Sequence, residues 1–170
     1  MVHLSLIFRH RHHLGAKEVR CLIKDLFWLQ NPNSIIEKGK NIEVAEILFD
    51  SQVYMIESIP VFFKIKNVVL PTLIYDMLLD LLPSVVVDMG AVPHVCNGAD
   101  IMVPGIVEIH GTFEEGSFVV VRDEKFNKPL AISTAFYGFK EFVLKSKGKV
   151  FKNNHFVGDP LWQAVKKLEN

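Results

Sequence analysis

A run of five basic residues near the start of the chain includes three histidines, a residue type that often binds metal ions. Arg9, His10, Arg11, His12 and His13 follow one another directly. A zinc site needs three or four converging ligands, and these histidines have no cysteine or carboxylate beside them in the sequence. We therefore expect no metal here. The run favours a solvated strand end, or a basic edge facing RNA that it would share with the cations Lys17, Arg20 and Lys24.

Carboxylates and thiols offer little for catalysis. Asp76 and Asp80 are spaced i, i+4, but acid–base work also needs a substrate pocket and separated pKa values, so the pair indicates a polar helix face. His94 and Cys96 are two residues apart and would not face each other on a helix. Cys21 and Cys96 lie far apart with no CxxC motif, which argues against a zinc knuckle or a disulfide scaffold. We expect no enzyme and no cofactor.

Glycine and proline are concentrated in residues 89–105, MGAVPHVCNGADIMVPG. Their spacing is neither GxGxxG nor GxxxxGK[ST], and no lysine follows Gly105, so a nucleotide phosphate loop is unsupported. Taken alone, the segment favours sharp turns, or places where another backbone or a ligand approaches closely.

Cations cluster in the last third of the chain. Arg122, Lys125 and Lys128 flank a predicted hairpin turn, and five lysines follow at Lys140, Lys145, Lys147, Lys149 and Lys152. A solvated face is the ordinary interpretation of such lysines. Phosphate contacts are the alternative, and these would make binding salt-dependent.

The elements that must position these residues differ between the two halves. In residues 16–29 the apolar side chains Val19, Leu22, Ile23 and Leu26 form the stripe of an amphipathic helix. Apolar runs at 41–49, 52–58 and 60–66 predict an antiparallel meander. Pro71 is expected to open a second helix over 71–82, with Leu73, Ile74, Met77, Leu78 and Leu81 buried and with Thr72, Asp76 and Asp80 on another face.

The second half predicts short strands and little helix. We expect a strand at 84–88, a hairpin of 117–123 and 129–137 around a turn at 124–128, a helical turn within 138–149 and a final strand at 149–156. Such a series is typical of a small barrel. The sequence therefore predicts an α+β protein with an accessory domain at 1–83 and a second domain at 84–170. Trp28 and Trp162 are expected to anchor packing, although exposed aromatic rings could stack bases.

Composition limits the function classes. The 170 residues carry 19 Lys+Arg and 19 Asp+Glu, and 49% are hydrophobic, which excludes a disordered chain and argues against a polybasic binder of nucleic acid or membrane. The apolar start at 1–8 is too short for a signal peptide. The apolar stretch 68–87 contains two prolines and two carboxylates, so we expect no membrane span and a soluble, cytoplasmic protein.

Read in order, the glycine-rich segment resembles the signature of the PUA domain, an RNA-binding module. The matching residues are Val87-Asp88-x-Gly90-Ala91-Val92 and Asn97-Gly98-Ala99-Asp100-Ile101-Met102-x-Pro104-Gly105-Ile106. Further matches resemble the stand-alone PUA proteins related to the malignant T-cell-amplified sequence family, archaeal-type members included: Phe62-Phe63-Lys64, Pro71-Thr72-Leu73, Leu82-Pro83, His155-Phe156 and Asp159-x-Leu161-Trp162.

The resemblance implies an accessory α/β domain followed by a PUA pseudo-barrel. It also implies a role in translation through the small ribosomal subunit or tRNA, in initiation, reinitiation or recycling, with an initiation-factor-like protein as partner. Carried over by position, the RNA-binding face comprises Gly90, Ala91, His94, Asn97, Gly98, Ala99, Asp100 and Met102. Residues 88–106 contain no Lys or Arg, so phosphate contacts are assigned to Arg122, Lys125, Lys128, Lys145, Lys147 and Lys149.

Two alternatives stay open. The chain could be the RNA-binding subunit of an RNA-modification or ribosome-biogenesis complex, because PUA domains often accompany such enzymes. It could also be a protein-interaction module whose glycine-rich face docks another chain and binds no RNA.

Overall fold

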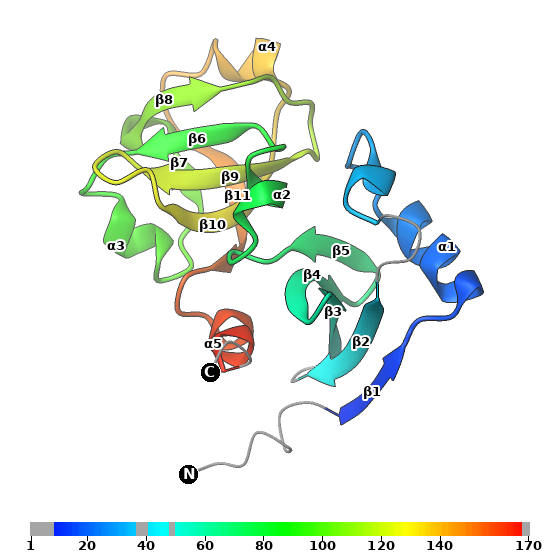
Figure 1. The fold of residues 1–170 in the computed structure, drawn as a ribbon. Helices are drawn as coiled ribbons and strands as arrows, with labels where there is room; N and C mark the ends of the chain where they lie inside the picture. Colours follow the sequence, from blue (N-terminus) through cyan, green and yellow to red (C-terminus); the bar gives the residue numbers. More distant parts are fainter. Residues whose placement is uncertain (1–8, 37–40, 48–49, 168–170) are drawn as a thin grey trace. The chain divides into compact units, whose positions relative to one another are not determined.

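The computed structural model describes residues 9–36, 41–47 and 50–167 (Figure 1). The start of the chain, on which the signal-peptide expectation rests, lies outside these ranges. Two compact units are present: one extends to Leu78 and includes the chain from Gln163, and the other comprises Leu79–Trp162. That residues 1–83 and 84–170 fold as separate domains stays a prediction. No helix in the described ranges is long and apolar enough to span a membrane.

The first unit is a five-stranded antiparallel sheet, sheet A, with a helix. Its strands lie in chain order: β1 (Arg9–His13), β2 (Ile42–Ile47), β3 (Ser51–Ile56), β4 (Ile59–Ile65) and β5 (Val68–Pro71). β2, β3 and β4 confirm the predicted meander, of which residues 48–49 lie outside the described ranges. β1 and β5 are additional edge strands.

The predicted helix is α1 (Ala16–Asp25), which ends four residues earlier than the pattern indicated; a short 3-10 helix, η2 (Pro32–Ser34), follows it. The predicted apolar stripe of α1 is confirmed. Leu22 and Leu26 are fully buried in the core of this unit, and Val19 and Ile23 pack against that core. Trp28 anchors the following turn: its ring lies edge-on to Phe62 and its indole N–H donates to the Val69 carbonyl at 2.8 Å.

The predicted helix over 71–82 is wrong. Pro71 is the last residue of β5 and pairs with Phe62, which an edge strand permits because its outer N–H groups have no ladder partner. Thr72 prolongs the strand contacts, since its N–H donates to Val61 and its hydroxyl to Pro60. Thr72 is therefore buried instead of sharing a helical face with the two aspartates.

Only one turn of that segment is helical, α2 (Asp76–Leu79). Leu73 and Leu78 are buried as expected, whereas Met77 and Leu81 are more than half exposed. The apolar spacing is compatible with a longer helix. Pro71 and Thr72, however, pair with β4 as an extension of the strand, so they cannot form the first turn of that helix.

The second unit is a curled six-stranded sheet, sheet B, in the order β7-β11-β10-β9-β6-β8 (Figure 1). β6 and β9 are parallel and all other neighbours are antiparallel. The strands are β6 (Ser84–Val87), β7 (Ile101–Met102), β8 (Ile106–His110), β9 (Phe118–Asp123), β10 (Pro129–Ala135) and β11 (Lys149–Phe156). The two edge strands, β7 and β8, are consecutive in sequence, so the sheet forms the expected pseudo-barrel.

The other secondary-structure elements predicted for this half are present. β9 and β10 form the expected hairpin, α4 (Phe139–Phe142) is the helical turn, and β11 is the final strand. A helix that we did not predict, α5 (Pro160–Lys166), follows β11. Valines of β6 and β9 share a core with aromatic side chains, in which Phe113 makes edge contacts with Phe139, Phe142 and Phe151.

Candidate RNA interface

The glycine-rich segment leaves sheet B after β6 and returns to it at β8. Between them lie α3 (Val92–Val95), β7 and the 3-10 turn η3 (Val103–Gly105). Asp88 closes the segment at its base: its N–H donates to the Gly105 carbonyl at 2.9 Å, and its Oδ1 accepts the Ala91 N–H at 2.7 Å. The loop is thus held at both ends by one residue of the signature.

Gly98 is required where the segment turns after α3. Its φ of +84° lies in the left-handed region, and a Cβ at this position would stand 2.9 Å from the ring of Phe156. Only glycine combines that backbone conformation with so close an approach. The signature glycine and the aromatic residue of β11 therefore form one packing contact.

Asn153 of β11 clamps the segment to the sheet, and sequence reasoning missed it. Its side-chain amide donates to the carbonyls of Val95 (3.0 Å) and Ala99 (3.1 Å), and its backbone N–H donates to Oδ1 of Asp100 at 3.1 Å. The one available signal was a pair of asparagines inside a predicted strand, where amide side chains are uncommon. Only the fold brings residue 153 to residues 95–100.

Asp100 is held from a second side by Lys149, whose Nζ lies 3.1 Å from Oδ2. Burial raises the pKa of Asp100, but the hydrogen bonds from Asn153 N–H and Lys149 outweigh it, so the pKa lies below its ordinary value. Asp100 is therefore an anion that orders the loop, and it is a positioning residue rather than an obvious contact for RNA phosphates.

The remaining residues of the predicted face are accessible to a partner. His94, Asn97, Ala99 and Met102 are exposed, as is Gly90, while Ala91 and Gly98 are partly buried. At Gly90 and Ala99, whose side chains are absent or small, a partner's backbone can approach the loop closely.

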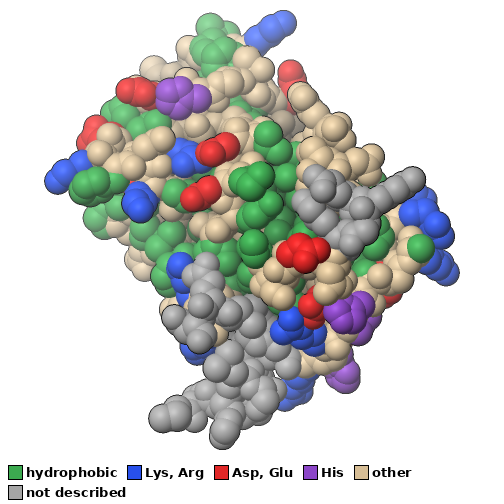
Figure 2. Space-filling model, in the orientation of Figure 1, with side chains coloured by type: hydrophobic (Ala, Val, Ile, Leu, Met, Phe, Trp, Pro, Cys, Tyr) green, Lys and Arg blue, Asp and Glu red, His purple; other side chains and the backbone are tan. Residues whose placement is uncertain are grey.

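The predicted phosphate-binding lysines are not all brought to this loop. Lys149 pairs with Met102 across β11 and β7, directly beside the loop, and Lys147 is exposed two residues before it. Lys145 is occupied: its Nζ lies 3.2 Å from Glu141 and 3.9 Å from the centre of the Tyr137 ring. In Figure 2, the basic side chains seen over sheet B occur singly or in small groups among acidic and apolar ones.

Arg122 is unsuited to phosphate. Its guanidinium is buried, lies 2.8 Å from Oδ1 of Asp80 and donates to the Asn127 carbonyl at 3.2 Å. The sequence suggested neither contact, because Asp80 lies 42 residues away. Arg122 therefore stands outside the proposed RNA interface.

The β9–β10 hairpin brings the other cations close to the start of the loop (Figure 1): Glu124 accepts the Met89 N–H at 2.9 Å. The turn is rigid, since the Asp123 carboxylate accepts N–H groups of Lys125, Phe126 and Lys128. Phe126, which sequence reasoning did not single out, is 65% exposed with Lys125 Nζ 5.1 Å from its ring centre. An exposed aromatic ring among lysines is the kind of group that stacks bases.

The basic run of β1 is largely matched by carboxylates that the local sequence did not show. Arg11 pairs with Glu43, His12 lies 3.1 Å from Glu18, and His10 lies 3.8 Å from Glu46. The hydrogen bond to Glu18 raises the pKa of His12 above its ordinary value. Within the described ranges, no three His, Cys, Asp or Glu side chains gather as a metal site.

The closing motif is structural. Asp159 accepts the Trp162 N–H at 2.7 Å, which caps the start of α5, and its other oxygen lies 2.7 Å from Nδ1 of buried His155. Burial raises the pKa of Asp159, but these hydrogen bonds outweigh it and leave the pKa below its ordinary value.

Comparison with known proteins identifies the class first. Residues 83–157 match the PUA domain model, and residues 10–77 match a domain of unknown function, DUF1947. A crystal structure of a hypothetical protein from Pyrococcus horikoshii OT3 is similar over 92% of this chain and 99% of its own, with a TM-score of 0.77 and 33% sequence identity. The fold and the loop thus define a PUA-domain protein with a DUF1947 unit before it.

Two relatives of similar sequence identify the family within this class. The chain is 39% identical over 158 residues to an uncharacterized protein of Methanocaldococcus jannaschii, covering 91% of this chain and 96% of that protein. It is 30% identical over 137 residues to translation machinery-associated protein 20 of Saccharomyces cerevisiae, covering 76% of each. The chain belongs to the family of PUA-domain proteins that includes translation machinery-associated protein 20, which confirms the resemblance drawn from the signature.

Proposed function

We propose that this chain is a non-catalytic RNA-binding protein of translation that acts in the cytoplasm through the small ribosomal subunit or tRNA, in initiation, reinitiation or recycling. The PUA domain is an RNA-binding fold, and a relative is named as associated with the translation machinery. The observation that carries the proposal is the preorganised loop 88–105, which Asp88, Gly98 and Asn153 hold on the sheet while Gly90 and Ala99 stay exposed.

In this proposal the loop contributes shape and the neighbouring lysines contribute charge. An RNA backbone lies against Gly90, Ala99 and Met102. Lys147 contacts a phosphate at one end, and so does Lys149, whose side chain is 64% exposed although its ammonium also pairs with Asp100. Lys125 and Lys128 contact phosphates at the other end, where Phe126 is available to stack a base. Recognition by shape and backbone suits a single-stranded or helical RNA end and does not require base-specific readout.

The balance of 19 cations and 19 anions favours modest affinity for free RNA. We therefore expect binding to be strengthened on the ribosome or by a protein partner with an initiation-factor-like domain.

The test is a salt titration of a fluorescent single-stranded RNA bound to the full chain, followed by fluorescence anisotropy. Replacing Lys147 and Lys149 by alanine removes two phosphate contacts, and each contributes about 0.7 to the slope of log K against log salt. The slope should fall by about 1.4. Lys167→Ala, which removes an exposed cation elsewhere, is the matched control and should leave the slope unchanged.

Co-purification from cell extract separates the alternatives. Recovery of small ribosomal subunits or tRNA supports the proposal. Recovery of an RNA-modifying enzyme would favour a modification or biogenesis complex instead. If no RNA binds at any salt concentration while other proteins co-purify, the chain is a protein-interaction module.

A further inference from the structure

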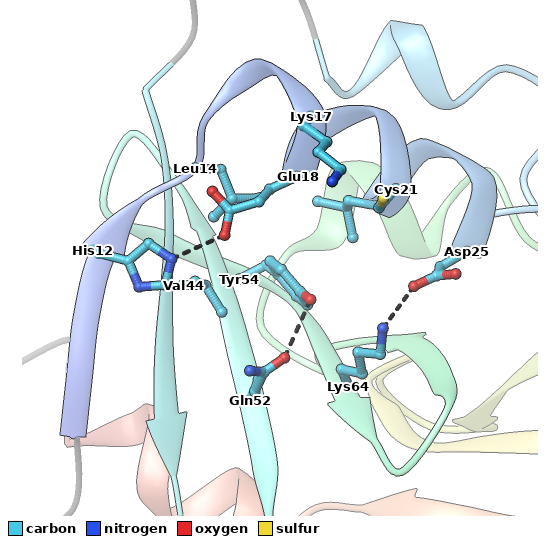
Figure 3. A pocket seen from close by; sticks show the side chains of 11 residues that line it. His12, Leu14, Lys17, Glu18, Cys21, Asp25, Val44, Gln52, Tyr54 and Lys64 are labelled. Atoms are coloured by element: carbon cyan, nitrogen blue, oxygen red, sulfur yellow. Dashed lines mark hydrogen bonds and ion pairs between the residues drawn. The ribbon is translucent and has the colours of Figure 1, made fainter.

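The first unit contains a groove whose lining residues lie outside the PUA signature and outside the proposed RNA-binding loop. It lies between α1 and strands β2, β3 and β4 and has a volume of about 340 Å³ (Figure 3). Leu22, Val44 and the ring of Tyr54 form its apolar floor. The volume lies at the lower end of the range for small-ligand sites, about 300–1,000 Å³, and suits a group the size of one nucleotide.

Two ion pairs hold the rim in place. Lys64 Nζ lies 2.7 Å from Oδ2 of Asp25, and this contact raises the pKa of Lys64. Glu18 is fixed by His12 at 3.1 Å and by the Gly15 N–H at 2.8 Å. The rim therefore presents carboxylate oxygens at defined positions instead of mobile side chains.

A row of cations continues from the rim along α1. Lys17 lines the groove, and Arg20 and Lys24 follow on the exposed side of the helix. None of the three has an acidic partner among the residues that the structure describes. Seven residues of helix separate the ends of the row by about 10 Å, so the row can follow a short length of an extended anionic chain.

We propose that this groove holds one unpaired nucleotide of an RNA strand, with the base in the groove and the backbone along Lys17, Arg20 and Lys24. The proposal rests on the RNA-binding function proposed above. Base amino groups are donors whose hydrogen bonds the carboxylates of Glu18 and Asp25 can accept. The Tyr54 hydroxyl donates to the Gln52 side-chain oxygen at 3.3 Å, so towards a base the hydroxyl can accept and the Gln52 amide group can donate.

An acidic peptide fits the same surface less well. It would also meet the cations of α1, but its side-chain carboxylates would lie against Glu18 and Asp25 without donors to offer them. A nucleotide carries its negative charge on the phosphate and its donors on the base, which matches the separation of cations and carboxylates here.

Cys21 is a built-in probe, because it is exposed and lines the groove. Cys96 is partly buried, and burial raises the pKa of its thiol, so it reacts more slowly. The rate of Cys21 alkylation by iodoacetamide is followed by mass spectrometry, with and without a saturating eight-nucleotide single-stranded RNA. We expect RNA to slow the reaction at least tenfold. Free nucleoside 5′-monophosphates at the same nucleotide concentration should protect little, since they cannot engage the whole row.

Variants test whether the groove itself is used. Cys21→Tyr fills the groove and should weaken RNA binding at least fivefold. Gln30→Tyr adds the same ring at an exposed position outside the groove and should leave binding unchanged. Circular dichroism verifies the fold of both variants. Lys17→Ala should lower the salt slope by about 0.7, and Lys167→Ala should not. The Lys147→Ala/Lys149→Ala protein should bind more weakly yet still protect Cys21 at saturation.

The failures are distinguishable. If RNA binds but Cys21 reacts at its free rate, the groove proposal is overturned and the proposed function stands. If no RNA binds, both fall. Protection by a poly-glutamate peptide but not by RNA would assign the groove to a protein segment, and full protection by free mononucleotides would exclude a strand as its ligand.

Discussion

Replacing Asn153 by alanine would separate the loop from the strand that supports it. The substitution removes two hydrogen bonds, to the carbonyls of Val95 and Ala99, and keeps the backbone bond to Asp100. All of these hydrogen bonds join Asn153 to the loop itself, so its side chain acts on RNA through the loop. It is therefore a positioning residue, and its loss tests whether loop order matters for binding.

The loss of stability in Asn153→Ala can be worked out from the two hydrogen bonds that it removes. A partly buried neutral hydrogen bond contributes about 1 kcal/mol and an exposed one about 0.5 kcal/mol. The loss is reduced because Oδ1 of Asn153 is buried with no hydrogen-bond partner within the described structure, so its removal costs nothing. We expect a net destabilisation of about 1 kcal/mol, which lowers Tm by about 2–4 °C for a chain of this size. If RNA binds only the ordered loop, its affinity falls by at most about fivefold.

Asn154→Ala is the matched control. The neighbouring asparagine donates instead to the Thr134 hydroxyl of β10 at 2.6 Å, away from the loop. Both variants should lose similar stability in thermal unfolding, but only Asn153→Ala should weaken RNA binding in the anisotropy assay. Equal RNA affinities for the two variants, at equal loss of Tm, would refute the view that the loop is held in place for RNA.

Three further predictions concern stability. Gly98→Ala should destabilise the fold by about 2 kcal/mol, because it places a Cβ in the left-handed region and against Phe156. Thermal unfolding measures this loss. In a Phe156→Ala background the same substitution should cost less, because the ring that the Cβ meets is gone, and an undiminished cost would contradict the clash. Asp159→Asn tests the lowered pKa of that carboxyl: its stabilisation is present above the unfolded pKa of about 3.9 and is lost as the pH falls through the lower folded pKa. In urea melts, the difference in unfolding free energy between wild type and variant should shrink below about pH 4, and a constant difference would contradict the assignment. Asp80→Ala should cost about 1 kcal/mol, since it deprives buried Arg122 of its charged partner while the Asn127 carbonyl remains; a chemical denaturation curve that coincides with wild type would disprove a structural role for the pair.

Local patterns were sufficient where one interaction decides an element. The stripe of α1, the meander of β2, β3 and β4 and the β9–β10 hairpin all follow from the period of apolar residues and from turn residues. The helix predicted over 71–82 failed because its apolar spacing suited a helix, whereas Thr72 had partners on β4 that no local pattern reveals.

The sequence by itself determined the class of protein, because the order Val87-Asp88 to Pro104-Gly105 is specific enough to identify the PUA fold. It also determined which loop to examine. Only the tertiary structure decided what each polar residue does: Asp100 and Asn153 fasten the loop, Arg122 belongs to Asp80, and Lys145 belongs to Glu141. The physical reason is that a charge or an amide acquires its role from the partner it meets within about 3 Å, and those partners lie up to 58 residues away along the chain.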